Sequence, residues 1–210
     1  GRSFKYRADV SADGDVEAEL TVRYENTVGV PSDYCYQPAA DPHPPCYWLY
    51  FRLYLPEGAS VTAVPRLPLP ETSVAATFRT SSADTVRVTE GADGFPAPAV
   101  EVSGLSVVEA AGVAEWRFAY EVPSAAAFRD GIWTYLLRIP KQPGIRDALV
   151  EVELRLPAGA CVVRALPEHI AGPLYLRFAL TLDRDLEVEV DYAIDPEACA
   201  KARLDSGQAP

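Results

Sequence analysis

The motif L-x-L-P-x-G-A-x-V occurs twice in this chain, and it limits the possible folds more than any other sequence feature. It reads Leu53-Tyr-Leu-Pro-Glu-Gly-Ala-Ser-Val61 and then, 101 residues later, Leu154-Arg-Leu-Pro-Ala-Gly-Ala-Cys-Val162. In each copy an alternating apolar run ends at a proline, which cannot donate a backbone hydrogen bond to a sheet, and a glycine turn follows. The motif therefore predicts a strand, a turn and a second strand, used twice, and indicates an internal duplication of β modules.

Alternation of apolar and polar residues with a period of two dominates the rest of the chain. Between residues 16 and 24 every second residue is apolar, which is typical of a half-buried strand, and Asp13-Gly14 predicts a hairpin to a strand at 4–10. The same pattern predicts strands at 47–55, 74–79, 85–89, 99–102, 115–122, 132–139, 149–156, 161–166, 174–182 and 186–194. Helical patterns are confined to 124–129 and 196–204.

The predicted fold is all-β: antiparallel immunoglobulin-like β-sandwich modules, two of them packed in tandem. Closely spaced short strands favour this class, and so do the 19 prolines and 13 glycines that supply turns between them. The repeat predicts a first module at 1–140, a second, smaller module at 141–199 and a C-terminal tail at 200–210. One continuous sandwich is the alternative.

The charge balance argues against several kinds of partner. With 19 Lys and Arg against 30 Asp and Glu, the formal net charge is −11, which repels the phosphates of nucleic acids and of anionic lipids. We therefore expect no nucleic-acid partner and no membrane contact by this fragment itself. Because the chain begins inside a predicted strand, we expect an anchoring segment upstream of it.

The four cysteines fall into two pairs with separate local roles. Cys35 and Cys46 bracket a loop with four prolines, and Cys161 and Cys199 connect a predicted strand to the C-terminal segment. We predict the disulfides Cys35–Cys46 and Cys161–Cys199, although three pairings are possible and four free thiols are the alternative. Disulfides imply an oxidising compartment, so we expect an extracytoplasmic location.

Motifs of known enzyme classes are missing from the sequence. There is no G-x-S-x-G elbow, P-loop or dinucleotide fingerprint, and neither His43 nor His169 lies in a zinc-protease pattern. The spacing of a structural zinc site is not found among Cys35, Asp41, His43 and Cys46. The acidic residues likewise lack the ligand spacing of a calcium-binding loop. We predict no enzyme activity, no metal and no cofactor; a glycoside hydrolase with a carboxylate pair is the least favoured alternative.

Aromatic residues gather around the predicted Cys35–Cys46 loop. Period two places Tyr47, Leu49 and Phe51 on the core face of one strand, so Trp48 and Tyr50 face the opposite way. Together with Tyr36 in the loop they form a candidate ligand-binding patch, because rigid aromatic faces with a polar edge suit sugar rings or protein partners. The alternative is that these side chains only pack.

Three sequence segments of the chain resemble segments of one bacterial protein family. They are similar to segments in the C-terminal β region of proteins with domain of unknown function 4012. The three segments are the strand ending in Lys141-Gln-Pro-Gly144, the early Leu20-Thr-Val-Arg-Tyr-Glu-Asn26, and Phe51-Arg-Leu-Tyr-Leu-Pro-Glu-Gly58. The resemblance implies membrane-anchored proteins of the cell envelope, facing outward, with no established catalytic residues. The Cys35–Cys46 loop departs from that pattern, and Lys141-Gln-Pro-Gly144 is also explained as a plain type II turn.

These observations predict a non-catalytic, extracytoplasmic structural or interaction region of a bacterial cell-surface protein. The expected partner is a cell-envelope polysaccharide or another surface protein. A polysaccharide-binding module that uses the aromatic patch is the alternative function.

Overall fold

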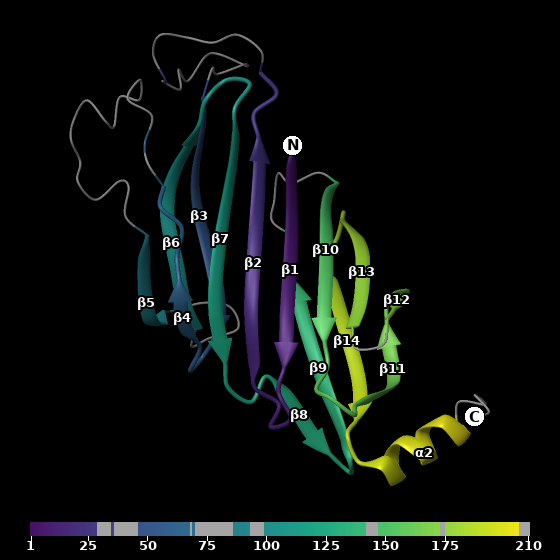
Figure 1. The fold of residues 1–210 in the computed structure, drawn as a ribbon. Helices are drawn as coiled ribbons and strands as arrows, with labels where there is room; N and C mark the ends of the chain where they lie inside the picture. The colour runs from purple at the N-terminus through teal and green to yellow at the C-terminus, as the bar shows by residue number, and fades with distance from the viewer. Residues whose placement is uncertain are drawn as a thin grey trace. The chain divides into compact units, whose positions relative to one another are not determined.

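The described part of this chain consists of strands and one C-terminal helix in a computed structural model (Figure 1). The structure describes residues 1–28, 35, 46–67, 69, 86–92, 99–141, 147–172 and 175–205. Its first seven strands are β1 (Arg2–Val10), β2 (Val16–Glu25), β3 (Tyr47–Pro56), β4 (Ser60–Ala63), β5 (Arg87–Ala92), β6 (Ala99–Val108) and β7 (Val113–Val122). The remaining elements are β8 (Ala126–Arg129), β9 (Ile132–Ile139), β10 (Ala148–Arg155), β11 (Cys161–Leu166), β12 (Ile170–Ala171), β13 (Tyr175–Leu182), β14 (Leu186–Ala193) and α2 (Pro196–Asp205).

The described strands form three sheets. A seven-stranded sheet has the order β12-β13-β10-β1-β2-β7-β4, a four-stranded sheet has the order β11-β14-β9-β8, and a three-stranded sheet has the order β3-β6-β5. The pairs β10–β13, β9–β14 and β3–β6 are antiparallel over their whole registers. The predicted fold class, all-β with mostly antiparallel sheets, is confirmed. No helix in the described ranges is long and apolar enough to span a bilayer.

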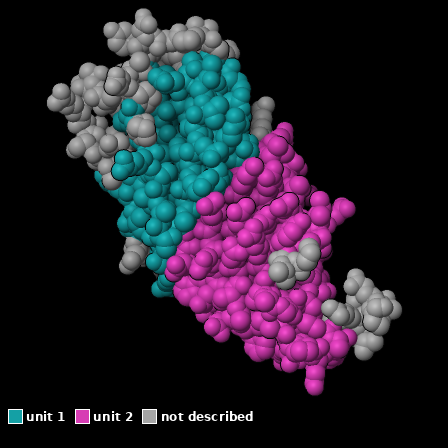
Figure 2. All heavy atoms as spheres, in the orientation of Figure 1, with its two compact units in different colours: residues 1–3, 21–119 teal, residues 4–20, 120–210 magenta. Residues whose placement is uncertain are grey.

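The chain divides into two compact units, coloured separately in Figure 2. Unit 1 comprises residues 1–3 and 21–119, and unit 2 comprises residues 4–20 and 120–210. The repeat predicts modules at 1–140 and 141–199 with a tail at 200–210, and this division stays a prediction. The predicted strand at 74–79 lies outside the described residues, and so does most of the segment Lys141–Gly144.

Both copies of the repeated motif form the same turn. The amide of Ala59 donates to the carbonyl of Pro56 over 3.1 Å, and the amide of Ala160 donates to the carbonyl of Pro157 over the same distance. The third residue of each turn is a glycine with a positive φ, 80° at Gly58 and 84° at Gly159, as a type II turn requires. The first turn leads from the three-stranded to the seven-stranded sheet, and the second from the seven-stranded to the four-stranded sheet.

Aromatic side chains fill the core of unit 1. The Phe51 ring lies 5.5 Å from the Trp116 ring and 5.4 Å from the Phe118 ring, measured between centroids. Gly104 pairs with Phe51 across the sheet, and a Cβ there would come within 3.0 Å of the Phe51 ring and 3.1 Å of Leu67. The glycine therefore makes room for the packing of β3 on β6.

A buried tyrosine cluster holds the core of unit 2. The hydroxyls of Tyr6 on β1 and Tyr135 on β9 share a hydrogen bond of 2.8 Å, and Tyr6 shares another with Tyr120 on β7. All three side chains are buried. Because each comes from a different strand, the cluster links elements that lie far apart in the sequence.

The C-terminal helix is capped at one end and covalently held. Asp195 accepts hydrogen bonds from the amides of Glu197 and Ala198 at 2.8 and 3.0 Å, and Pro196 is the first helical residue, as expected of a helix start. The predicted helix at 196–204 is confirmed, and the disulfide Cys161–Cys199 joins it to β11. The prediction of a helical segment at 124–129 is wrong, because residues 126–129 form strand β8.

Alanine at Gly159 should destabilise unit 2. No atom lies within 4 Å of the position that a Cβ would take, so the cost comes from the left-handed backbone alone, about 1–2 kcal/mol. Gly159→Asn should cost less, because asparagine tolerates this conformation. Urea unfolding followed by circular dichroism measures both variants, and equal losses for alanine and asparagine would contradict this explanation.

Candidate binding surface

Strand β3 presents one face to the core of unit 1 and the other away from it. Phe51 on the first face packs on Trp116 and Phe118, which fixes the orientation of the whole strand. The opposite face follows the same period of two and carries Trp48, Tyr50, Arg52 and Tyr54. Within the three-stranded sheet β3 lies at an edge and pairs with β6.

Trp48 is packed against the first disulfide. Cys35 and Cys46 form a bridge with a Cα–Cα distance of 5.3 Å, and both are buried together with Val107. Trp48 and Leu69 lie partly buried against this group. The indole nitrogen of Trp48 is buried and has no hydrogen-bond acceptor among the described residues. This tryptophan therefore covers the disulfide rather than standing free in solvent.

The next three outward side chains on β3, Tyr50, Arg52 and Tyr54, are exposed, and Arg52 contacts both tyrosines. Tyr50 is 55% exposed and Tyr54 is 39% exposed. The guanidinium of Arg52 lies over the Tyr50 ring, 5.6 Å from its centroid, and donates to the Tyr54 hydroxyl over 3.4 Å. Arg52 also pairs with Glu101 on β6 at 3.8 Å. The row thus alternates an aromatic ring, a cation and a second aromatic ring.

The predicted site residues fall in different environments. Tyr50 lies on the exposed row, Trp48 lies beside the disulfide, and Tyr36 lies outside the described residues. Both predicted disulfides are present, Cys35–Cys46 and Cys161–Cys199, and they indicate an oxidising environment. The sequence interpretation missed Arg52 and Tyr54, although continuing the period of two from Trp48 and Tyr50 would have reached them.

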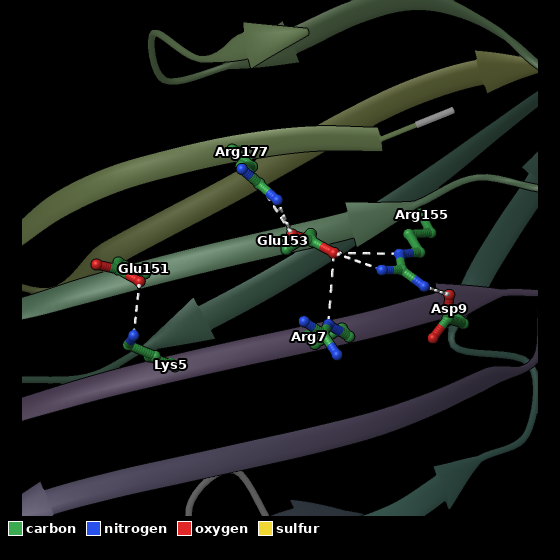
Figure 3. A network of polar contacts seen from close by, with 7 residues as sticks. All are labelled: Lys5, Arg7, Asp9, Glu151, Glu153, Arg155 and Arg177. Atoms are coloured by element: carbon green, nitrogen blue, oxygen red, sulfur yellow. Dashed lines mark hydrogen bonds and ion pairs between the residues drawn. The ribbon is translucent and has the colours of Figure 1, made fainter. Parts of the chain in front are cut away.

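A second charged surface lies on unit 2, where three arginines surround one carboxylate (Figure 3). Glu153 on β10 contacts Arg177 at 2.8 Å, Arg155 at 3.0 Å and Arg7 at 3.4 Å. Its side chain is only 13% exposed. Desolvation, the largest single effect, raises the pKa of Glu153, but the hydrogen bonds from Arg177 and Arg155 and the charges of Arg177 and Arg7 outweigh it and lower the pKa overall.

The unit 2 network spans three neighbouring strands. Arg155 also contacts Asp9 on β1 at 3.8 Å, and Lys5 contacts Glu151 at 3.5 Å. Opposite charges on facing strands stabilise a sheet. Each cation here contacts at least one carboxylate, so we attribute this surface to the stability of the sheet.

Metal ligands do not gather in the described part of the chain: no group of three or more His, Cys, Asp or Glu side chains there could hold an ion. His169 lies 5.5 Å from the Phe178 ring, and its Nδ1 is 3.3 Å from the carbonyl of Pro167. His43 lies outside the described ranges.

No protein-family profile and no curated protein matches this chain. Among solved structures, it is similar to the M1 zinc metallopeptidase of Deinococcus radiodurans, with 10% identity and a TM-score of 0.40 over 91% of this chain and 41% of that one. It is also similar to native leukotriene A4 hydrolase of Saccharomyces cerevisiae, with 6% identity and a TM-score of 0.47 over 90% of this chain and 28% of that one. The chain thus spans less than half the length of either protein, and the similarity concerns the β-rich fold alone.

Removing the Trp48 side chain should destabilise unit 1 more than removing its neighbour on the same face. A fully buried tryptophan costs about 3–5 kcal/mol when truncated to alanine, so the partly buried Trp48 should cost about 2 kcal/mol. Tyr50→Ala is the matched control and should stay within about 0.5 kcal/mol of the wild type, as exposed side chains do. Denaturant unfolding measures both; a neutral Trp48→Ala would show that the indole does not support the disulfide.

Glu153 should stabilise unit 2 in a pH-dependent way. Because its folded pKa is lowered, the stabilisation is complete above the unfolded pKa of about 4.3 and is lost as the pH falls through the folded pKa. Glu153→Gln should lower the free energy of unfolding at pH 7 by about 1 kcal/mol and flatten its decline in acid.

The control for this change lies two residues away on the same strand. Glu151 forms a single ion pair among the described residues, with Lys5, and both side chains are about two-thirds exposed, 64% and 67%. Glu151→Gln should therefore change stability by less than about 0.5 kcal/mol. If the two variants unfold alike between pH 3 and pH 7, the arginine cluster has no special role.

Proposed function

We propose that this chain is a non-catalytic, extracytoplasmic structural and interaction region of a bacterial cell-surface protein. The observation that carries the proposal is the pair of disulfides: one holds Cys35 beside β3, and the other holds α2 on β11. Bridges of this kind form and persist in oxidising compartments. They close loops with sequence separations of 11 and 38 residues, so both restrict the unfolded chain.

The resemblance to the C-terminal β region of the domain 4012 family supports the same proposal. Two of its three segments fall on described strands: Phe51–Gly58 covers the second part of β3 and its turn, and Leu20–Asn26 falls largely on β2. In that family the β region follows a membrane anchor, so we propose that an upstream segment anchors this protein to the envelope.

Thiol labelling in the bacterium that makes the protein tests the location. Because the disulfides protect all four cysteines, a polyethylene glycol maleimide added to denatured cell extract should shift the protein on a gel only after reduction. The control is a cytosolic protein with free thiols, which should be labelled without reductant. Labelling of all four cysteines before reduction would place the protein in a reducing compartment and overturn the proposal.

A polysaccharide-binding role is the second candidate, and the exposed row on β3 favours it. Tyr50 and Tyr54 lie four residues apart on one face, about 13 Å at 3.3 Å per residue. Two exposed rings at this separation suit sugar rings along an extended polymer, because aromatic faces stack on the apolar faces of sugars. The partner in this case is a cell-envelope polysaccharide. Titration with a neutral and with an acidic polysaccharide tests this candidate: binding of either one supports it, and binding of neither overturns it.

A further inference from the structure

The outward face of the three-stranded sheet carries a second arginine in line with Arg52. Arg52 on β3 lies directly opposite Ser103 on β6, and Arg87 on β5 lies opposite the same serine from the other side. Residues directly opposite each other in antiparallel strands point to the same side of a sheet. Arg52, Ser103 and Arg87 therefore form one row across the sheet, with the two arginines on one face.

Spacing and exposure make both arginines available to one ligand. Two strand spacings separate their backbones, about 10 Å. Arg87 is exposed, and the Arg52 side chain is 55% exposed, whereas Ser103 between them is small and buried. No bulky side chain therefore stands between the two guanidinium groups within the row.

Aromatic and polar side chains extend this surface along the strands. Tyr50 and Tyr54 flank Arg52 on β3, and Thr89 follows Arg87 on β5, opposite Glu101. We call the set Tyr50, Arg52, Tyr54, Arg87 and Thr89 the arginine–tyrosine face. Among the described residues Glu101 is the carboxylate that pairs with this face, at 3.8 Å from Arg52 with its side chain 17% exposed, so one carboxylate there stands against two cations.

We propose that the arginine–tyrosine face binds an acidic polysaccharide, whose carboxylates pair with Arg52 and Arg87 while its sugar rings stack on Tyr50 and Tyr54. The proposal rests on the polysaccharide-binding candidate and adds the chemical class of the polymer. Arginine suits it because the planar guanidinium donates two parallel hydrogen bonds to a carboxylate. Such a local cationic face is notable in a chain with a net charge of −11.

The alternation of aromatic rings and cations on this face fits a uronic-acid polymer better than other polyanions. Nucleic acids need many phosphate contacts for useful affinity, and this face offers two arginines. An acidic peptide would use the arginines without needing two exposed rings on the same row. A sugar acid uses both, since each unit of the polymer combines a ring with a carboxylate.

Calorimetric titration with three polymers tests the proposal: polygalacturonate, neutral dextran and poly-glutamate. Wild-type protein should bind polygalacturonate, with at least tenfold weaker binding to each of the other two. Arg52→Gln and Arg87→Gln should each weaken polygalacturonate binding by about tenfold, as loss of a charge-assisted hydrogen bond predicts. Tyr54→Ala should weaken it as well.

Arg138→Gln is the matched control. Arg138 lies on β9 in unit 2, where its side chain is 67% exposed and pairs across strands with Glu187 at 2.8 Å. It resembles Arg52 in charge, exposure and cross-strand pairing but lies outside the face, so its variant should bind like the wild type. Arg52→Lys keeps the positive charge that pairs with Glu101 and should retain part of the affinity.

Each other outcome has a distinct meaning. Dextran binding that equals polygalacturonate binding, with the arginine variants unaffected, would overturn the acidic polymer and leave the polysaccharide-binding candidate standing. Equal binding of poly-glutamate would overturn the sugar in favour of an acidic protein partner. Failure of all three polymers to bind would overturn both this inference and that candidate. Circular dichroism of every variant confirms that it folds.

Discussion

The glycine-containing turn of the L-x-L-P-x-G-A-x-V motif is the constraint on which the sheet arrangement depends. Its carbonyl-to-amide hydrogen bond closes over four residues, and its third residue needs a positive φ that only glycine adopts without cost. The strand after each turn joins a different sheet from the strand before it. Without the turns at Gly58 and Gly159, β3 would not lead into β4, nor β10 into β11, in this geometry.

Much of the fold follows from local sequence, and the failures have identifiable causes. The bounds of β9 and β11 are as the alternation predicts, because both strands end at clear turn residues. Strand β6 runs six residues beyond its predicted end, and Gly104 in this extension allows the close approach of Phe51. The sequence pattern predicts a helical turn where strand β8 forms, although Asp130-Gly131 after it is a strong hairpin signal, and both residues have positive φ.

The candidate surface was predictable only along a single strand. The alternation of side chains along a strand correctly places Trp48 and Tyr50 on one side of β3, but it does not distinguish a ring that packs on a disulfide from an exposed ring. That difference depends on where Cys35 and Val107 lie in space. Arg87 could not have been associated with Arg52 at all, because their common partner Ser103 is set by the registers of two non-adjacent strands with β6.

The buried tyrosine cluster of unit 2 also sets a limit on the alkaline side. Burial, the largest effect in each case, raises the pKa of Tyr6, Tyr120 and Tyr135 above that of a free tyrosine. An acid whose pKa is raised by folding stabilises the protein fully below its unfolded pKa, here about 10, and loses that contribution as the pH rises through the folded value. Ionisation of these phenols in strong base therefore lowers the free energy of unfolding of unit 2, so the interior of the sheet, and not only its surface charge, responds to alkaline pH.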